Sequence, residues 1–134
     1  MSEQSAEKFI EALGKLENNE DVETIVALFA DDADIGNVTL TNTLNGTDGV
    51  REFWTNYRKT FGEVNSKFHN KICSENVSAL EWTTTGTSAN GSEINYDGVS
   101  ILEFNDGGKI ERFFAYFNPA KIGHQIEEAK ANAG

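Results

Sequence analysis

A single carboxylate, Glu81, lies in a segment rich in strand-forming residues, and Thr83 and Thr85 follow it at alternate positions. The period of two along a strand places these three side chains on one face. If that face lines an enclosed space, a carboxylate without a counter-charge could act there as a general acid or base. The alternative is a surface position, in which Glu81 has no chemical role.

Other patterns that support catalysis or cofactor binding are missing from the sequence. The two histidines, His69 and His124, are far apart and have no cysteine or carboxylate at ligand spacing, so no metal site is expected. Cys73 has no neighbour in the sequence that would activate its thiol. No phosphate-binding loop, nucleotide fingerprint or triad spacing occurs. We therefore expect no metal and no cofactor.

The charge balance restricts the partners. The chain of 134 residues carries 22 acidic and 11 basic side chains, a formal net charge of −11 at pH 7. Such a surface repels phosphate backbones and anionic lipid, so neither nucleic acid nor a membrane is expected as a partner. The single cysteine suits a reducing compartment, and the polar start of the chain is unlike a signal peptide. These features predict a cytoplasmic protein.

The length fits a single domain, which we place at residues 1–134, with a core at about 7–119. Four segments show apolar residues at helical spacing: 9–16, 22–29, 47–61 and a C-terminal tail at 119–134. A short strand is expected at 32–39, and strand character is almost continuous from 64 to 117.

Turn signals divide the long strand region. They lie at Ser74–Asn76, at Asn90-Gly91 and at Asn105–Gly108, and Asn-Gly is a strong short-hairpin signal because both residues tolerate positive φ. Consecutive hairpins form an antiparallel sheet, and the helices that precede it must cover one face. The sequence therefore predicts an α+β fold in which a curved antiparallel sheet forms a cone closed by N-terminal helices. Such a cone encloses a pocket.

The segment from Asp21 to Ile35 resembles the signature of the nuclear transport factor 2 superfamily, in particular of the SnoaL-like polyketide cyclases and the ketosteroid isomerases. The later segments Tyr96–Phe104 and Tyr116–Asn118 fit the same pattern, so the resemblance covers roughly residues 7–119. It implies the cystatin-like cone fold. It implies little about activity, since this fold hosts isomerases, cyclases, hydrolases, dehydratases and non-catalytic modules.

The resemblance also places the catalytic positions of the ketosteroid isomerases. Their carboxylate base falls on Asn37, whose amide cannot take a proton at neutral pH, and their protonated aspartate falls on Ser100, which offers one hydrogen bond but no carboxyl group. The His and Asp of the SnoaL-like cyclases fall in Arg112–Ala115, which contains neither residue. Ketosteroid isomerase and SnoaL chemistry are therefore not expected, and Asn37, Ser100 and Glu81 are the candidate catalytic positions of a non-standard site.

An inward Ser100 fixes the remaining pocket wall by alternation along the strands. The same register, carried across the Asn90-Gly91 turn, turns Glu81 inward. The candidate ligand-contacting residues lie on one helix and three strands: Trp54, Thr83, Thr85, Tyr96, Phe113, Ala115 and Phe117. One β-bulge would instead place Trp82, Phe114 and Tyr116 inside.

The opposite, convex face of the sheet is expected to be partly apolar. Its residues in this register are Val99, Ile101, Glu103, Ile110, Arg112, Phe114 and Tyr116. An exposed face with this much apolar area is usually an interface. Sheet-to-sheet dimers are common in the superfamily, so we expect a homodimer.

We expect a SnoaL-like protein that binds a small, largely apolar molecule. Whether it is an isomerase-, cyclase- or hydrolase-type enzyme with a non-standard site, or a non-catalytic ligand-binding or dimerisation module, stays open. The missing carboxylates at Asn37 and Ser100 favour the module, whereas an inward Glu81 or Asp97 would favour the enzyme. A transport adaptor would need an exposed partner surface, which the sequence does not identify.

Overall fold

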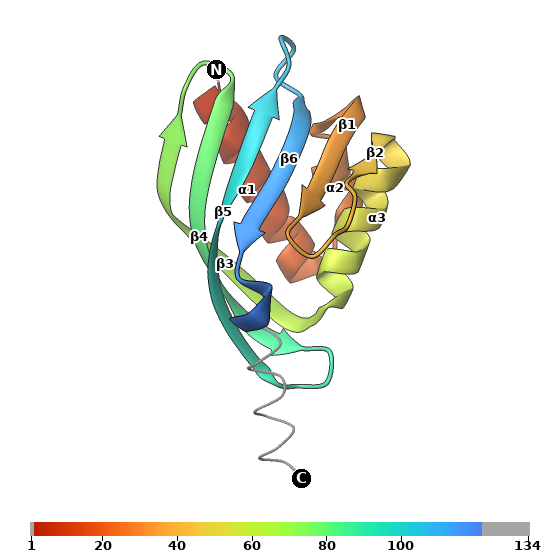
Figure 1. Ribbon diagram of the computed structural model, residues 1–134, viewed down its shortest axis with the longest axis vertical. Helices are drawn as coiled ribbons and strands as arrows, with labels where there is room; N and C mark the ends of the chain where they lie inside the picture. Colours follow the sequence, from red (N-terminus) through yellow and green to blue (C-terminus); the bar gives the residue numbers. More distant parts are fainter. Residues whose placement is uncertain (1, 122–134) are drawn as a thin grey trace.

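A computed structural model describes residues 2–121 of the chain (Figure 1). Its elements follow one another in the order α1 (Ser2–Asn19), α2 (Val22–Val26), β1 (Phe29–Asn37), β2 (Leu44–Asn45), α3 (Gly46–Lys59), β3 (Phe61–Cys73), β4 (Val77–Ser88), β5 (Glu93–Phe104) and β6 (Ile110–Phe117). The predicted order of helices and strands is confirmed, with the short strand β2 as an addition. Residues 119–121 are helical, and the rest of the predicted C-terminal tail lies outside the described residues.

The six strands form one sheet in the order β2-β1-β6-β5-β4-β3. All neighbouring strands are antiparallel except β1 and β6, which run parallel, with Phe29 opposite Ile110. In Figure 1 the long strands β3 to β5 curve, and the helices lie together behind the sheet on its concave side. The expected α+β fold with a curved, mainly antiparallel sheet closed by helices is confirmed.

Two helices supply the apolar faces that cover the sheet. In α1, Ala6, Phe9, Leu13 and Leu16 are buried and recur every three or four residues, so that one side of the helix packs on β3 and β4. In α3, Phe53 and Trp54 are buried, and the helix packs on β1. Within residues 2–121 no helix is both long enough and apolar enough to cross a membrane.

Two aromatic residues that continue the helical periodicity lie in strands instead. Phe29 begins β1, where the neighbouring Leu28 carbonyl accepts a hydrogen bond from Ile110 N at 2.9 Å. Phe61 begins β3 and lies opposite Ser88. In both places, strand pairing with a distant segment provides hydrogen bonds for the backbone and overrides the local helical pattern.

The loop between β4 and β5 determines which side of β4 faces the helices. Ser88 N donates to Ser92 O at 2.7 Å, and Gly91, with φ of 90°, closes a turn by donating to Ser88 O at 3.0 Å. Three residues therefore separate this pair, in place of the two of the shortest Asn-Gly hairpin. The odd loop length sets Thr84 opposite Tyr96, so that both share the concave face.

A second register change turns Ile110 inward. Glu103 lies opposite Arg112, but Phe104 lies opposite Ile110, so Glu111 is an extra residue on β6. Ile110 is only 1% exposed, and the expectation that it lies on the convex face is wrong. The expected outward residues Glu103 and Arg112 form an ion pair at 2.9 Å.

Candidate functional site

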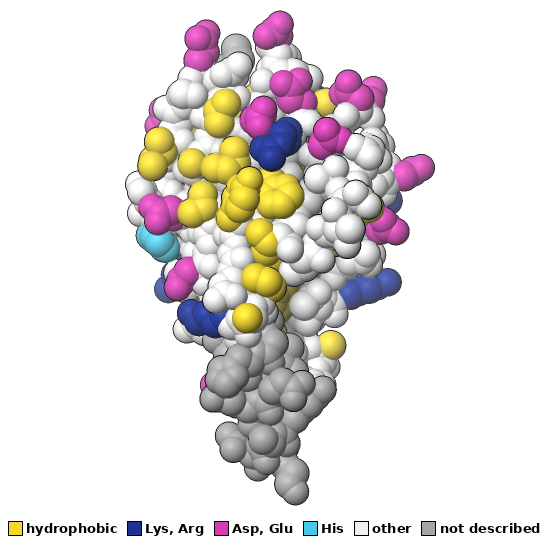
Figure 2. Space-filling view, viewed as in Figure 1, with side chains coloured by type: hydrophobic (Ala, Val, Ile, Leu, Met, Phe, Trp, Pro, Cys, Tyr) yellow, Lys and Arg dark blue, Asp and Glu magenta, His cyan; other side chains and the backbone are white. Residues whose placement is uncertain are grey.

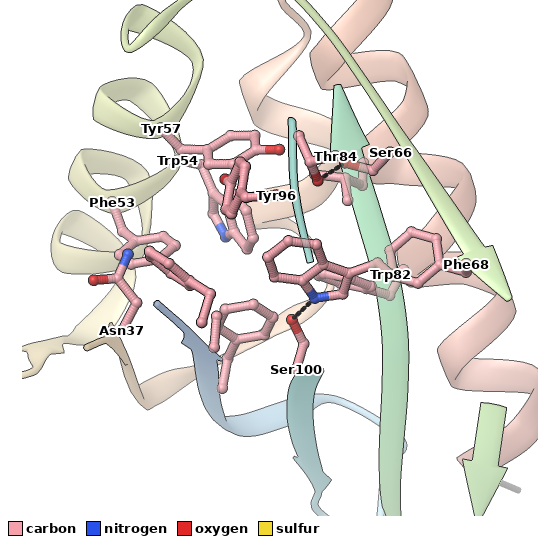
Figure 3. A pocket seen from close by; sticks show the side chains of 15 residues that line it. Asn37, Phe53, Trp54, Tyr57, Ser66, Phe68, Trp82, Thr84, Tyr96 and Ser100 are labelled. Atoms are coloured by element: carbon pink, nitrogen blue, oxygen red, sulfur yellow. Dashed lines mark hydrogen bonds between the residues drawn. The ribbon is translucent and has the colours of Figure 1, made fainter. Parts of the chain in front are cut away.

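An inner cavity lies between the helices and the concave face of the sheet (Figure 3). Its volume is about 60 Å³. Its wall is made of side chains from α1, α3 and five strands: Phe9, Leu13, Asn37, Phe53, Trp54, Tyr57, Ser66, Phe68, Trp82, Thr84, Tyr96, Ser100, Phe113, Ala115 and Phe117. For comparison, a protein cavity of about 150 Å³ holds benzene. The inner cavity alone is therefore smaller than the small-molecule cavity expected from the sequence.

An outer cavity of about 360 Å³ adjoins the inner one. The two share a wall of five residues: Asn37, Phe53, Tyr57, Tyr96 and Phe117. The outer cavity is also bordered by Leu40 and by Pro119 at the C-terminal end of the described chain. Together the two cavities reach the size range of small-molecule sites, about 300–1,000 Å³.

Most of the residues predicted for the pocket wall do line the inner cavity: Asn37, Trp54, Tyr96, Ser100, Phe113, Ala115 and Phe117. Asn37 is at the end of β1 and borders both cavities. Whether any of them contacts a ligand or takes part in a reaction stays a prediction.

The expected inward position of Glu81, Thr83 and Thr85 is wrong, because the three-residue hairpin loop puts their neighbours Trp82 and Thr84 on the concave face. Glu81 points to the other side of the sheet, where it accepts a hydrogen bond from Asn70 Nδ2 at 2.6 Å. Thr83 donates to Asp97 Oδ1 at 2.6 Å on the same side. Neither Glu81 nor Asp97 can therefore act on a molecule in the inner cavity.

Phe114 and Tyr116, the residues that an alternative register would have turned inward, stay on the convex face. Tyr116 is 47% exposed, and its ring centroid lies 4.7 Å from that of Phe114. Of the three residues that the alternative places inside, only Trp82 lines the cavity.

Aromatic rings form most of the cavity wall. Trp54 is the centre of this group, with ring centroids of Phe53 at 4.9 Å and Phe113 at 5.2 Å in edge-to-face orientation. On the facing side, Trp82 and Tyr96 contact each other with ring centroids 5.2 Å apart. Such a wall suits a flat, largely apolar molecule.

Two indole nitrogens of the wall differ in their hydrogen bonding. Trp82 Nε1 donates to Ser100 Oγ at 2.9 Å. Trp54 Nε1 is buried and has no hydrogen-bond partner among the described residues. A buried N–H group without a partner is costly, and this one belongs to a residue of the cavity wall.

Asn37 also has an unused donor. Its Oδ1 accepts hydrogen bonds from Thr39 N at 2.9 Å and from Thr39 Oγ1 at 2.6 Å. These bonds fix the amide orientation and leave the Nδ2 group without a bond to residues 2–121. At the position where the family resemblance places the isomerase base, this chain thus carries a hydrogen-bond donor.

A buried carboxylate, Glu17, lies behind the hydroxyl groups at one end of the cavity. It is 4% exposed. Its Oε1 accepts from Ser66 N at 2.9 Å, and its Oε2 accepts from Ser66 Oγ and from Tyr57 Oη, both at 2.7 Å. Thr84 Oγ1 lies 2.7 Å from Ser66 Oγ. The sequence signal for this group is a charged residue on the buried side of α1, four positions after Leu13.

The tyrosines near Glu17 keep their protons. Burial, with the Glu17 charge as a smaller contribution, raises the pKa of Tyr57 well above that of a free phenol. The same two causes raise the pKa of Tyr96. Both side chains are therefore neutral hydroxyl groups at physiological pH.

No group of three or more metal-ligating side chains occurs within residues 2–121. The cavity wall, as far as it is described, contains no charged side chain. The polar groups that reach the cavity are hydroxyl, amide and indole groups, which can bind and orient a molecule.

The comparisons with known proteins agree with this architecture. The sequence profile of the SnoaL-like domain matches residues 6–113. An epoxide hydrolase of the LEH-like type from Mycobacterium tuberculosis has a TM-score of 0.72 at 18% identity, and the alignment covers 93% of this chain and 91% of that one. TerC, crystallised with polyporic acid, has a TM-score of 0.79 at 19% identity, with coverage of 94% and 98%.

An NTF2-like protein of unknown function from Burkholderia pseudomallei K96243 has a TM-score of 0.80 at 21% identity, with coverage of 93% and 96%. At these identities the structural likeness shows the fold alone. No curated protein matches the chain by sequence. Since the profile match covers most of the chain, the protein belongs to the SnoaL-like family, within the NTF2-like fold.

Proposed function

We propose that this protein binds a small, largely apolar molecule that carries a neutral oxygen acceptor, such as a ketone. The apolar part would occupy the outer cavity, and the acceptor would reach through the shared wall to the inner one. The observation that carries the proposal is the buried, unpaired Nε1 of Trp54 in a wall of aromatic rings. A bound acceptor would satisfy this N–H group, which lacks a partner among the described residues.

Two further polar groups of the wall support the same ligand class. Ser100 Oγ accepts from Trp82, so its own hydroxyl proton is free to donate, and Asn37 Nδ2 is a further donor. All three groups donate, so they favour an acceptor on the ligand. No cationic side chain lines the described wall, which favours a neutral carbonyl over a carboxylate.

The cavity sizes set the way in which such a molecule would bind. About 60 Å³ holds a carbonyl group or a few waters, whereas the outer 360 Å³ holds a ring system. A larger ligand requires Phe53, Tyr96 or Phe117 of the shared wall to change rotamer. TerC, which has the same fold, has been crystallised with polyporic acid, so a cone of this type has been seen with an organic molecule.

Catalysis by the isomerase route is not part of the proposal, because Asn37 offers no base and Glu81 points away from the cavity. The alternative is a module that serves dimerisation and binds nothing in the cone.

Cys73 is a free thiol, and the cytoplasm stays our proposal for the compartment.

Matched probe pairs test the proposal. 1-Indanone and indane have nearly the same flat shape, but only the ketone carries an acceptor. We expect 1-indanone to bind the wild type more tightly by about 3–10-fold, the value of one hydrogen bond to a neutral acceptor. Trp54→Phe removes the N–H group and should abolish this preference while leaving indane binding in place.

Trp82→Phe is the matched control, because it removes an indole N–H group that already has a partner in Ser100. This variant should still prefer the ketone. Isothermal titration calorimetry would measure the affinities. Failure of both probes to bind the wild type, or an equal ketone preference in Trp54→Phe and wild type, would overturn the proposal.

A further inference from the structure

Three hydrogen-bond donors converge on the two oxygens of Glu17. The Tyr57 and Ser66 hydroxyl groups and the Ser66 backbone N–H all donate to it, at 2.7 to 2.9 Å. This is the arrangement that an ionised carboxylate requires, because it can only accept. A buried charge of this kind is tolerated where hydrogen bonds replace the lost water.

The carboxylate fixes the direction of the hydroxyl groups around it. The Tyr57 proton points to Glu17, so Tyr57 Oη can only accept from its other neighbours, of which Ser66 is one. The Ser66 proton also points to Glu17, and Thr84 must therefore donate to Ser66 across their 2.7 Å contact. Thr84 Oγ1, in turn, has lone pairs to offer.

These oxygens border the inner cavity. Tyr57, Ser66 and Thr84 are all part of its wall, and Figure 3 shows their hydroxyl groups gathered on one side of it. A hydroxyl group ordinarily serves as donor or acceptor with equal ease. Here Glu17 makes Tyr57 and Thr84 acceptors, whereas Trp54, Ser100 and Asn37 offer protons elsewhere in the wall.

We propose that Glu17 makes this side of the cavity specific for a hydroxyl group on the ligand, so that the ligand is a flat hydroxy-carbonyl compound. The ligand hydroxyl donates to Tyr57 or Thr84, and the carbonyl accepts from Trp54. This inference rests on the proposed function and adds a second polar group to its ligand. Glu17 acts through Tyr57 and Ser66 and is therefore a positioning residue.

The burial of Tyr57 and the nearby Glu17 charge support this arrangement, since both raise the pKa of the Tyr57 phenol. The phenol keeps its proton at physiological pH, and that proton is committed to Glu17. A ligand that presents only an acceptor to this side of the cavity meets the lone pairs of Tyr57 and Thr84. The contact between two acceptors is unfavourable.

The test compares three sets of probes by calorimetry: 1-indanone, hydroxy-1-indanones with the hydroxyl at each free ring position, and the corresponding methoxy compounds. We expect at least one hydroxy compound to bind the wild type about 5–10-fold more tightly than 1-indanone, and its methoxy counterpart to lose that gain. The ratio between hydroxy and methoxy affinities is the readout, because a purely structural role of Glu17 would not change it.

Glu17→Gln keeps an oxygen for Ser66 N but introduces an NH₂ donor toward the hydroxyl groups. We expect its hydroxy-to-methoxy ratio to fall to about 1 while 1-indanone affinity changes less than about twofold. Glu11→Gln, on the exposed side of the same helix, is the matched control and should keep the wild-type ratio. If Glu17→Gln does not fold, Tyr57→Phe tests the same point by removing one of the acceptors.

The outcomes separate the two proposals. If 1-indanone does not bind the wild type, the proposed function fails. If 1-indanone binds but no hydroxy compound gains affinity, the role of Glu17 in hydroxyl recognition is overturned and the proposed function stands. A hydroxyl gain that persists in both Glu17→Gln and Tyr57→Phe also overturns that role.

Discussion

The indole of Trp82 lies directly over Gly98, its partner on the neighbouring strand. A methyl group added at Gly98 would lie 2.4 Å from the six-membered ring of Trp82 and 2.6 Å from the Tyr116 carbonyl oxygen. The missing side chain at Gly98 thus makes room for the indole, which reaches along β5 to donate to Ser100. The cavity wall depends on this glycine for space.

We predict that Gly98→Ala destabilises the protein by about 1–3 kcal/mol, the usual cost of overpacking a core, because Trp82 must leave its position. Urea unfolding monitored by circular dichroism would measure the change. Gly14→Ala is the control: it lies within α1, its new methyl group meets no atom within 4 Å, and helix propensity predicts a gain of about 0.5–1 kcal/mol. An unchanged stability of Gly98→Ala would show that Trp82 does not need the space at Gly98.

Substitution of Glu17 should distinguish lost hydrogen bonds from lost charge. Glu17→Leu leaves Ser66 N and the Tyr57 hydroxyl without their buried acceptor, and we expect a loss of about 2–5 kcal/mol in the free energy of unfolding. Glu17→Gln retains part of the hydrogen bonding and should lose less. The exposed Glu11→Gln should stay within about 0.5 kcal/mol of the wild type. Equal stabilities of the Leu and Gln variants would show that the hydrogen bonds contribute little.

Alkaline pH should destabilise the protein through Tyr57 and Tyr96. In the unfolded chain both phenols ionise near pH 10, whereas in the folded protein burial and the Glu17 charge raise both pKa values. The unfolded state therefore loses its protons first. The contribution of the two phenols to the free energy of unfolding is fully present below about pH 10. Above that pH it should fall, by about 1.4 kcal/mol per pH unit for each tyrosine.

The measurement is urea unfolding at a series of pH values above 9. Tyr57→Phe and Tyr96→Phe should each reduce the slope of the free energy of unfolding against pH by the contribution of one tyrosine. The double variant should reduce it by the contributions of both. The comparison with the wild type cancels the contribution of the lysines. A decline that is unchanged in both single variants would show that neither phenol causes it.

The convex sheet face stays our proposal for a homodimer interface. Figure 2 shows apolar side chains gathered in the middle of this face, with acidic groups mainly toward its edge. Glu103 and Arg112 neutralise each other there, so two copies of a chain with net charge −11 can approach at this face with little repulsion. A second copy is therefore the partner that fits it.

Tyr116→Glu should convert the dimer to a monomer, because it places a charge beside Phe114 and opposite Val99, two apolar residues of this face. Sedimentation velocity at increasing concentration would show the change. Leu40→Glu, which charges another exposed apolar residue that borders the outer cavity, should leave the dimer intact. A wild-type protein that is monomeric at high micromolar concentration would refute the proposal.

The fold could be predicted from the sequence because its signals are local: helical periodicity in α1 and α3, and turn residues between long strands. The inward face of β4 could not, since it depends on whether the loop at Asn90-Gly91 contains two or three residues. A difference of one residue exchanges Glu81 for Trp82 on the cavity wall. The position of Ile110 escapes prediction for a similar reason, the extra residue Glu111 in β6.

The role of Glu17 could not be predicted because its partners are remote. Ser66 and Tyr57 lie 49 and 40 residues away along the chain, and no local pattern connects them. The residues predicted by family resemblance and by strand alternation, such as Trp54, Ser100 and Phe113, do line the cavity, since their placement needs no knowledge of the β4–β5 loop.

The parallel pairing of β1 with β6 joins the beginning of the sheet to its end. A ribosome that has released only the first hundred residues has exposed β1 without the strand that lies beside it. Formation of the β1–β6 pair must therefore await the synthesis of Ala115, which lies opposite Asn37, and pairing across so long a loop is slow. During translation, the aromatic residues of β1 and α3 would be open to chaperones or to aggregation for the time that the last strand takes to emerge.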